Sequence, residues 1–338
     1  MIDKAIRKVI DRHDLGRDEM AEVFGEVMDG KASDVQKSAL LVALRMKGET
    51  AEEITGAALA MRARVTPLTV EGDRIVDTCG TGGDGRGTFN VSTVAAIVAA
   101  GAGASVAKHG NRAVSSACGS ADVLKELGVN IDLDAPRMSE VLRRTGISFL
   151  FAPKLHPAMG AVVGVRRELG IRSIFNVLGP LTNPAFARRQ VLGVYAEHLV
   201  DLLGDVLLAL GTEHAMVVHS RDGLDEISVS APTRVCEVVG GAPRRYELTP
   251  ADIDIELSSI DDLAGGDAAE NARIARRILE GEPGARADIV AANAGAALYV
   301  SGAAASLRDG VALAREALAS GRAGGKLEEL VRVSNEVA

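Results

Sequence analysis

The sequence of 338 residues contains no tryptophan, and aromatic side chains make up only 3% of it. Proteins that bind single-stranded nucleic acids stack the bases on aromatic side chains, and this chain has few to offer. Its formal net charge of -8 also disfavours general binding to a polyphosphate backbone. We therefore expect no nucleic-acid partner, and we expect any anionic ligand to be held by a local site.

Cysteine is scarce, and long apolar runs are missing. The three cysteines, Cys79, Cys118 and Cys236, have neither metal-ligand spacing nor the even number of a disulfide framework, which indicates a reducing compartment. The first residues are charged and amphipathic rather than a signal peptide, and the longest apolar stretch, 94–107, is too short to cross a bilayer. These features predict a soluble cytoplasmic protein with no membrane partner.

Proline is missing from residues 1–66, and this part of the chain reads as a series of helices. Residues 33–36 and 50–53 are capping boxes, in which a hydroxyl and a later acid or amide satisfy free N–H groups at a helix start. With 47% hydrophobic residues, the chain as a whole can bury a large core. The sequence therefore predicts a small helical domain, residues 1–72, at the N-terminus.

From residue 73 onward, short β-branched runs alternate with helices rich in Ala and Leu, the pattern of a mostly parallel sheet covered by helices. The candidate strands are 74–78, 105–108, 148–151, 190–195 and 215–219, with an edge hairpin at 233–239 and 244–248. The candidate helices include 92–100, 121–127, 136–145, 157–169 and 197–210. The predicted fold class is α/β, with a larger domain, residues 73–338, whose mostly parallel central sheet is flanked by helices. We expect part of the region around 160–190 to pack with the helical domain.

Carboxylates are missing from residues 85–121, although the chain contains more acids than bases. The charged residues in this segment are Arg86, Lys108 and Arg112, and small polar residues surround them. The N–H groups of a glycine-rich turn, hydroxyls and a helix N-terminus together make an anion site. The segment therefore predicts a site for a phosphate or a pyrophosphate.

The carboxylate-free segment begins in a glycine loop, 80–85, that matches the dinucleotide-binding pattern G-x-G-x-x-G. In a dinucleotide site the third glycine opens a helix, and an acidic residue about 20 positions later binds the ribose. Here the loop continues through residue 90, and the region that should hold the acid is rich in Ala and Gly. A phosphate site is therefore favoured over a nicotinamide or flavin site and over a flexible turn.

A second polar cluster, Lys108–Arg112, directly follows the candidate strand 105–108. Ligands of α/β sheets bind at the carboxyl ends of the strands. If this strand lies beside the strand 74–78, through a right-handed crossover, both polar loops open on the same edge.

Eight motifs occur in an order that resembles the anthranilate phosphoribosyltransferase family. They are Asp77–Asp84, Asn90–Thr93, Lys108–Ser116, Gly119–Asp122, His156–Met159, Val165–Gly170, Phe175–Pro184 and Asp222–Glu226. The resemblance implies the fold of the type II nucleoside phosphorylases, with the active site between the two domains and a homodimer formed through the helical domain. It implies a pentosyltransferase of tryptophan biosynthesis, which transfers the phosphoribosyl group of 5-phosphoribosyl 1-diphosphate to anthranilate. Cys118 is a mild departure from the family pattern beside the site.

The resemblance also implies roles for individual residues. It assigns the donor to Gly80, Gly83, Asp84, Thr88, Asn90, Val91, Ser92, Thr93, Lys108, His109, Gly110, Asn111, Arg112, Ala113, Val114, Ser115, Ser116 and Ser120. It assigns anthranilate to Gly80, Asn111 and Arg166, and two Mg²⁺ ions per subunit to Asp225 and Glu226 with the help of Ser92. No residue is required as an acid or a base, because the aromatic amine is already neutral at neutral pH and its orientation matters more.

Two alternatives remain open at the level of sequence. A pyrimidine-nucleoside phosphorylase of the same fold begins its second motif with the same Lys-His pair but continues with Ser-Thr-Gly-Gly, where this chain has Gly110, Asn111 and Arg112. A non-enzymatic nucleic-acid-binding homologue would be expected to show a basic surface helix and degraded motifs. The net charge of -8 and the intact motifs disfavour that homologue.

Overall fold

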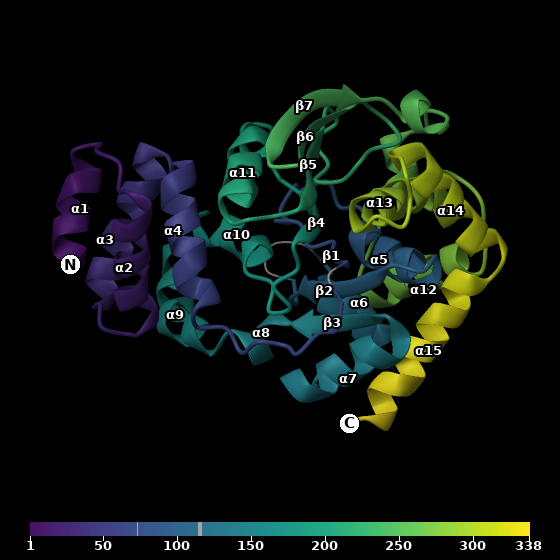
Figure 1. Cartoon of the computed structure of the whole chain (residues 1–338), viewed down its shortest axis with the longest axis horizontal. Coiled ribbons are helices and arrows are strands. Elements are labelled where there is room, and N and C mark those ends of the chain that lie inside the picture. Colours follow the sequence, from purple (N-terminus) through teal and green to yellow (C-terminus); the bar gives the residue numbers. More distant parts are fainter. Residues whose placement is uncertain (73, 114–116) are drawn as a thin grey trace.

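The structure is a computed structural model that describes residues 1–72, 74–113 and 117–338. Four helices begin the chain and form the bundle at the left of Figure 1: α1 (Ile2–Ile10), α2 (Arg17–Met28), α3 (Asp34–Lys47) and α4 (Ala51–Arg62). Both predicted capping boxes are present, at the start of α3 and at the start of α4. Helices α2 and α4 pack closely at Gly56, where an added Cβ would lie 2.2 Å from the carbonyl oxygen of Arg17.

The larger part of the molecule is built on one sheet of seven strands in the order β3-β2-β1-β4-β5-β6-β7. The strands are β1 (Ile75–Asp77), β2 (Ser105–Gly110), β3 (Ile147–Phe151), β4 (Arg189–Gly193), β5 (His214–Ser220), β6 (Thr233–Val239) and β7 (Ala242–Leu248). Strands β1 to β5 pair in parallel, and β6 and β7 add an antiparallel hairpin at one edge. The predicted mostly parallel sheet and the predicted edge hairpin are therefore confirmed.

Helices cover both faces of this sheet, as its apolar strands require. They are α5 (Val91–Gly101), α6 (Ser120–Glu126), α7 (Ala135–Thr145), α11 (His198–Ala209), α12 (Ala268–Leu279), α13 (Ala285–Ser301), α14 (Leu307–Ala319) and α15 (Arg322–Glu336). The helix predicted at 157–169 is divided, because Pro157–Met159 forms a 3-10 turn before α9 (Gly160–Leu169). The short helices α8 (Ala152–Leu155) and α10 (Phe175–Leu178) flank this segment.

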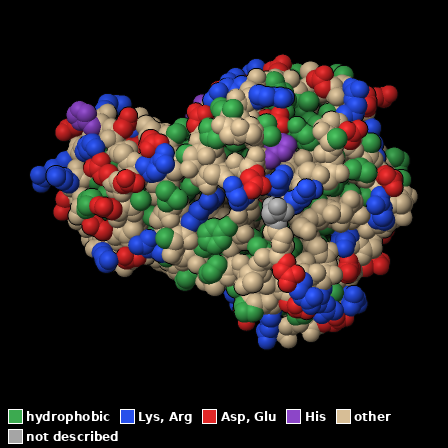
Figure 2. Space-filling model, viewed as in Figure 1, with side chains coloured by type: hydrophobic (Ala, Val, Ile, Leu, Met, Phe, Trp, Pro, Cys, Tyr) green, Lys and Arg blue, Asp and Glu red, His purple; other side chains and the backbone are tan. Residues whose placement is uncertain are grey.

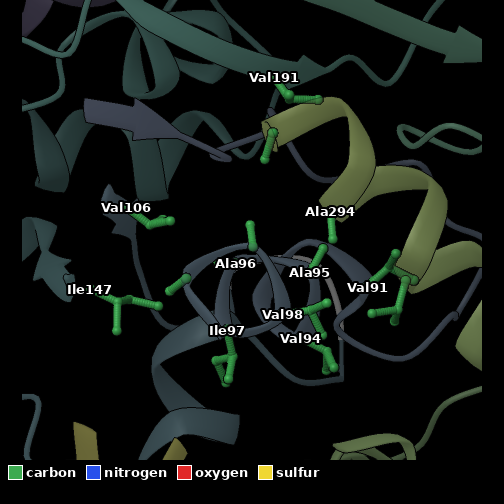
Figure 3. Close-up of a cluster of buried hydrophobic side chains, with 14 of the residues drawn as sticks. Val91, Val94, Ala95, Ala96, Ile97, Val98, Val106, Ile147, Val191 and Ala294 are labelled. Atoms are coloured by element: carbon green, nitrogen blue, oxygen red, sulfur yellow. The ribbon is translucent and has the colours of Figure 1, made fainter. Parts of the chain in front are cut away.

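Helix α5 lies at the centre of the main core and contains no charged residue. Its small side chains Ala95 and Ala96 allow neighbouring elements to approach closely, and Figure 3 shows Ala294 of α13 pointing toward Ala95. Val106 of β2 and Ile147 of β3 belong to the same cluster. The burial of α5 fixes the position of its N-terminus at the edge of the sheet.

A second core joins the N-terminal bundle to the rest of the chain. It contains Val162 and Val165 of α9, Phe175 of α10, and apolar residues of α11 together with the inner faces of α1 to α4. Helix α9 packs against both α2 and α3. In the described parts of the chain, no helix is long and apolar enough to span a membrane.

Candidate active site at the carboxyl edge of the sheet

The carboxyl ends of β1 and β2 bring the two polar loops of the sequence to the same edge. The two strands pair in parallel, with Ile75 opposite Ser105 and Val76 opposite Val106. The glycine loop after β1 and the loop after β2 therefore leave the sheet side by side, as expected from the sequence. We call these loops the first wall, residues 78–90, and the second wall, residues 110–120.

The first wall is anchored at both of its ends. Near its start, the N–H of Thr81 donates to the carbonyl oxygen of Gly193 at 2.8 Å, and the Thr81 hydroxyl accepts from the N–H of Tyr195 at 3.0 Å. Near its end, the backbone N–H of Phe89 donates to the carbonyl oxygen of residue 263, and the N–H of residue 265 donates to the carbonyl oxygen of Gly87. Thr88 forms a β-bridge with the residue between them. Between these anchors the four glycines of 82–87 have positive φ angles, which leaves backbone N–H groups available to a ligand.

An arginine that the sequence did not single out also holds the first wall. The Nη2 atom of Arg172 donates to the carbonyl oxygen of Gly83 at 2.5 Å. The same guanidinium lies 4.2 Å from the ring centroid of Tyr195, a favourable cation–π distance. Arg172 thus connects the segment after α9 to the glycine loop.

The second wall is closed on itself by side-chain contacts. Asp122 accepts hydrogen bonds from the N–H groups of Ala113 and Gly119, both at 3.0 Å. A side chain at position 110 would be crowded, because an added Cβ would lie 2.3 Å from Oγ of Ser120 and 2.6 Å from the ring of Phe149. Arg112 is exposed, and its guanidinium lies 5.6 Å from the ring centroid of Phe151. The candidate donor residues Val114, Ser115 and Ser116 lie outside the described residues.

Asn90 links the two walls at the start of α5. Its Nδ2 donates to the carbonyl oxygen of Cys118 at 3.1 Å, and its Oδ1 accepts from Nδ2 of Asn271 at 3.0 Å. Asn271 belongs to α12 and is buried, and sequence reasoning missed it. The side chains of Val91 and Thr93 are also buried, so Val91 presents only its backbone to a ligand.

Lys108 lies under the first turn of α5. Its Nζ donates to the carbonyl oxygen and to the hydroxyl of Thr78, both at 3.2 Å, and to Oγ of Ser92 at 3.3 Å. Burial lowers the pKa of this amine, while nearby acidic groups oppose the shift. A buried ammonium at a helix N-terminus makes this point of the site strongly attractive to anions.

The carboxylates Asp225 and Glu226 reach the same helix terminus from the loop after β5. Oε1 of Glu226 accepts a hydrogen bond from the N–H of Ser92 at 3.1 Å. Burial, followed by the charge of Asp84, raises the pKa of Asp225 to about 7. Burial, followed by the charge of Asp225, raises the pKa of Glu226 well above its ordinary value. Three acidic side chains therefore share one small region, in which burial and mutual repulsion disfavour their ionised forms.

This donor set suits a divalent cation that prefers oxygen ligands. Among the described residues, no group of three or more His, Cys, Asp or Glu side chains is arranged to hold a metal ion by itself. Mg²⁺ is commonly bound by one or two carboxylates together with substrate phosphates and water, rather than by a cage of protein ligands. The pair Asp225 and Glu226, beside an anion site, fits that mode of binding.

Arg166 stands on α9, the helix that packs against α2 and α3 of the N-terminal bundle. It is half-buried, its guanidinium lies 5.2 Å from the ring centroid of Phe175, and burial lowers its pKa. Among residues 1–72, 74–113 and 117–338, no carboxylate forms an ion pair with Arg166. Its neighbour Arg167 is exposed. Arg166 is thus a cation available to a carboxylate ligand.

His109 meets a second histidine that the sequence reasoning did not place in the site. The Nε2 atoms of His109 and His156 lie 3.1 Å apart, and both rings are buried. The N–H of His109 donates to Oδ1 of Asp77, whose pKa is raised by burial to about 6. The pair lies beneath the start of the second wall.

Figure 2 shows basic side chains next to acidic ones and a histidine near the centre of this face, to the right of the N-terminal bundle. The arrangement combines N–H donors, a buried lysine, a carboxylate pair and an arginine without an ion-pair partner among the described residues. The first three can hold a phosphorylated ligand with a divalent cation, and the arginine suits a carboxylate ligand.

Known proteins resemble this chain over its whole length. A model of the glycosyl transferase family α/β domain matches residues 72–324, and a model of that family's helical bundle domain matches residues 3–65. The anthranilate phosphoribosyltransferase of Anaeromyxobacter sp. (strain Fw109-5) is 56% identical over 334 residues, which cover 99% of each chain.

Solved structures agree with this match. The anthranilate phosphoribosyltransferase of Thermus thermophilus is 46% identical, superposes with a TM-score of 0.93, and is matched over 98% of this chain and 99% of its own. The Saccharomyces cerevisiae enzyme in complex with PRPP and Mg is 28% identical, with a TM-score of 0.91 over 99% of this chain and 98% of its own. The yeast enzyme has also been solved in complex with 4-fluoroanthranilate.

Proposed function

The chain belongs to the anthranilate phosphoribosyltransferase family, and from this premise we propose how its residues carry out the transfer. The reaction joins the phosphoribosyl group of 5-phosphoribosyl 1-diphosphate to anthranilate and releases diphosphate. The product is N-(5-phosphoribosyl)anthranilate, in the second step of tryptophan synthesis from chorismate. The family assignment favours this reaction over nucleoside phosphorolysis and over a non-enzymatic role.

We propose that the donor lies between the two walls, with phosphate oxygens at the N-terminus of α5. The observation that carries this proposal is the convergence of Lys108, the backbone of Ser92 and the carboxylate pair on that helix terminus. Backbone N–H groups of the glycine loop and the hydroxyls of Thr88 and Ser120 complete the set. They orient the C1 atom of ribose toward the acceptor, which is the main requirement when the nucleophile is a neutral amine.

Two Mg²⁺ ions per subunit are proposed at Asp225, Glu226 and Ser92. Bound there, the metal supplies positive charge against the negative charge that accumulates on the departing diphosphate. Asp225 and Glu226 hold that charge close to the donor, and Lys108 adds a fixed cation of its own. The yeast relative has been solved in complex with PRPP and Mg, which supports a magnesium ion as the cation that accompanies the donor.

Arg166 is proposed to bind the carboxylate of anthranilate, with Asn111 and Gly80 lining the acceptor site. The support is its half-buried guanidinium with no ion-pair partner in the described chain. A planar guanidinium binds a carboxylate with two parallel hydrogen bonds. Arg166→Ala should raise KM for anthranilate about tenfold to a hundredfold and change KM for the donor little. Arg167→Ala, at the exposed neighbouring position, is the matched control, and equal small effects of both substitutions would refute the assignment.

The assay that tests the function follows the fluorescence of anthranilate, which should fall when the donor and Mg²⁺ are added. Replacement of Asp225 by Asn together with Glu226 by Gln should abolish the part of the turnover that depends on Mg²⁺. Unchanged turnover in that variant would refute the metal role. Phosphate-dependent cleavage of thymidine would decide for the phosphorylase instead.

The N-terminal bundle, residues 1–72, is proposed as a separate domain that forms a homodimer in the cytoplasm. The residues Val35, Ala39, Val42 and Met46 follow one another at intervals of four, three and four along α3, and Val35 and Met46 are 79% and 71% exposed. An apolar stripe of this kind is typical of a helix that packs against another helix. Val35→Glu with Met46→Glu should therefore give a monomer in sedimentation experiments.

The matched control for this test is Leu257→Glu, because Leu257 is 73% exposed and lies in the larger part of the chain. It should leave the sedimentation coefficient of the dimer unchanged. A dimer that survives both substitutions in α3 would overturn the proposed interface.

A further inference from the structure

The loop between β5 and β6 has to hold two like charges side by side. It carries Asp225 and Glu226, and the charge of Asp225 is one cause of the raised pKa of Glu226. Repulsion between neighbouring carboxylates would drive a loose loop toward conformations that separate them. The contacts that hold this loop therefore decide whether the pair is available to a cation.

Asn293 of α13 fixes the loop immediately after Glu226. Its Oδ1 accepts from the N–H of Ile227 at 2.9 Å, and its Nδ2 donates to the carbonyl oxygen of Ile227 at 3.0 Å. Nδ2 also donates to the carbonyl oxygen of Ile289 at 2.9 Å, one turn earlier in α13. Asn293 is only 3% exposed and stands among apolar residues of the core. A buried amide is costly unless it is paired, and this one is paired with both backbone groups of a single residue.

Asp222 closes the loop from the other side. Its carboxylate accepts hydrogen bonds from the hydroxyls of Ser220, Ser228 and Ser230, the bond from Ser228 being 2.6 Å long. It also accepts from the N–H of Leu224 at 3.3 Å. These partners lie on both sides of the carboxylate pair in the sequence, so Asp222 ties the two ends of the loop together.

Helix α13 also positions the group that Glu226 contacts. Ala294, the residue after Asn293, points toward Ala95 of α5 (Figure 3), and α5 begins with the N–H of Ser92 that binds Glu226. Asn293 therefore sets the position of the loop, while the next residue sets the position of the helix terminus that the loop must meet. Gly193 limits the loop further, because a Cβ at that position would lie 1.6 Å from the carbonyl oxygen of Asp225.

We propose that Asn293 and Asp222 are positioning residues that hold Asp225 and Glu226 ready for a divalent cation before the donor arrives. This inference rests on the proposed role of Asp225 and Glu226 as metal ligands. Neither Asn293 nor Asp222 is proposed as a ligand of the cation. Asn293 acts on the backbone of Ile227, and Asp222 acts on three serine hydroxyls and the N–H of Leu224, as outer partners orient metal ligands in other proteins.

The test measures Mn²⁺ binding to the full chain without donor, from the loss of the electron paramagnetic resonance signal of free Mn²⁺. Asn293→Ala and Asp222→Asn should each raise the dissociation constant of Mn²⁺ about tenfold to a hundredfold. The matched control is Ser334→Ala, since Ser334 is an equally buried polar residue on α15 whose hydroxyl accepts from the N–H of Asn130 and does not contact this loop. It should leave the Mn²⁺ dissociation constant unchanged.

A second measurement separates positioning from general support of the fold. In Asn293→Ala and in Asp222→Asn, the Mg²⁺ concentration needed for half-maximal turnover should rise, while KM for anthranilate stays the same. Circular dichroism is used to check that each variant is folded. If Asn293→Ala does not fold, the result for Asp222→Asn alone decides the test.

The outcomes distinguish this inference from the metal assignment itself. If the double variant Asp225→Asn with Glu226→Gln binds Mn²⁺ as the wild type does, the metal role of the pair is wrong. If that double variant loses Mn²⁺ while Asn293→Ala and Asp222→Asn retain wild-type affinity, the positioning role is overturned. An equal loss in the Ser334→Ala control would also overturn it, because the effect would then be a general one.

Discussion

The buried histidine pair beneath the second wall predicts how the stability of the protein depends on pH. His109 and His156 are 3% and 8% exposed, and their Nε2 atoms lie 3.1 Å apart. Burial, and then the neighbouring His156, lowers the pKa of His109 to about 3, and burial lowers the pKa of His156 to about 4. Both rings are therefore neutral in the native protein, whereas a histidine of the unfolded chain titrates with a pKa of about 6.5.

The sign of the effect follows from these pKa values. Below about pH 6.5 the unfolded chain binds protons that the native rings do not accept. The free energy of unfolding therefore decreases as the pH is lowered. Between about pH 8 and about pH 5 each imidazole should lower the free energy of unfolding by about 2 kcal/mol. Replacing His156 by Gln keeps a hydrogen-bonding group beside His109 but removes one of the two titrating rings. The variant should therefore lose about 2 kcal/mol less than the wild type over this pH interval.

The measurement is urea-induced unfolding followed by circular dichroism, at both pH values, for the wild type and His156→Gln. The tested quantity is the change in the free energy of unfolding between the two pH values. Any cost of the substitution that does not depend on pH therefore cancels. The contribution of Asp77, which has the opposite sign to that of the histidines, is present in both proteins and cancels as well. The exposed His198, replaced by Gln, is the control and should leave the pH dependence of the wild type intact. If His156→Gln loses as much stability as the wild type, His156 is not held neutral in the native state, and the reasoning fails.

Three further substitutions test the geometry of the site. Gly193→Ala would place a Cβ 1.6 Å from the carbonyl oxygen of Asp225, and displacement of the carboxylate loop should lower kcat/KM about a hundredfold while circular dichroism shows a folded protein. Arg172→Ala removes the hydrogen bond to Gly83 and should raise KM for the donor several-fold but not KM for anthranilate, and the reverse pattern would show that Arg172 does not support the first wall. Gly110→Ala would place a Cβ 2.6 Å from a phenyl carbon of β3, and it should lower the free energy of unfolding in urea by about 1–3 kcal/mol. An unchanged urea midpoint would contradict this close packing.

Local patterns of the sequence were sufficient to predict much of the fold and one half of the site. The alternation of short β-branched runs with helices predicts a parallel sheet, because strands buried on both faces are apolar throughout. The absence of carboxylates from 85–121 predicts the anion site. This prediction is possible because the cations, the hydroxyls and the N–H groups that attract an anion all lie within one segment of the sequence. The order of the family motifs then indicates the ligands that the site takes.

The remaining parts of the site depend on partners that are distant in the sequence. Asn293 binds Ile227 across 66 positions, and Asn271 binds Asn90 across 181. A hydrogen bond between a buried amide and a distant backbone group leaves no periodic signal in either segment. An Asp-Glu pair in a polar turn likewise looks like an exposed loop, until the tertiary structure brings Glu226 to the start of α5. The two asparagine contacts could not be predicted without the positions of α12 and α13, and the carboxylate pair is indicated only by the family motif.

The N-terminus of α5 connects the two halves of the proposed chemistry through charge. In the structure its Ser92 N–H donates to Glu226, so a carboxylate already occupies a position that suits a phosphate oxygen. A diphosphate placed at the same terminus would meet the negative charge of Glu226 and Asp225, and Lys108 alone does not balance that charge. Neutralisation of the carboxylates would therefore strengthen donor binding, and by reciprocity a bound donor would strengthen binding of the neutralising cation. The loop with Asp225 and Glu226 attracts the cation, and the carboxylate-free segment 85–121 attracts the diphosphate. Because the two ligands carry opposite charges, each lowers the electrostatic cost of binding the other.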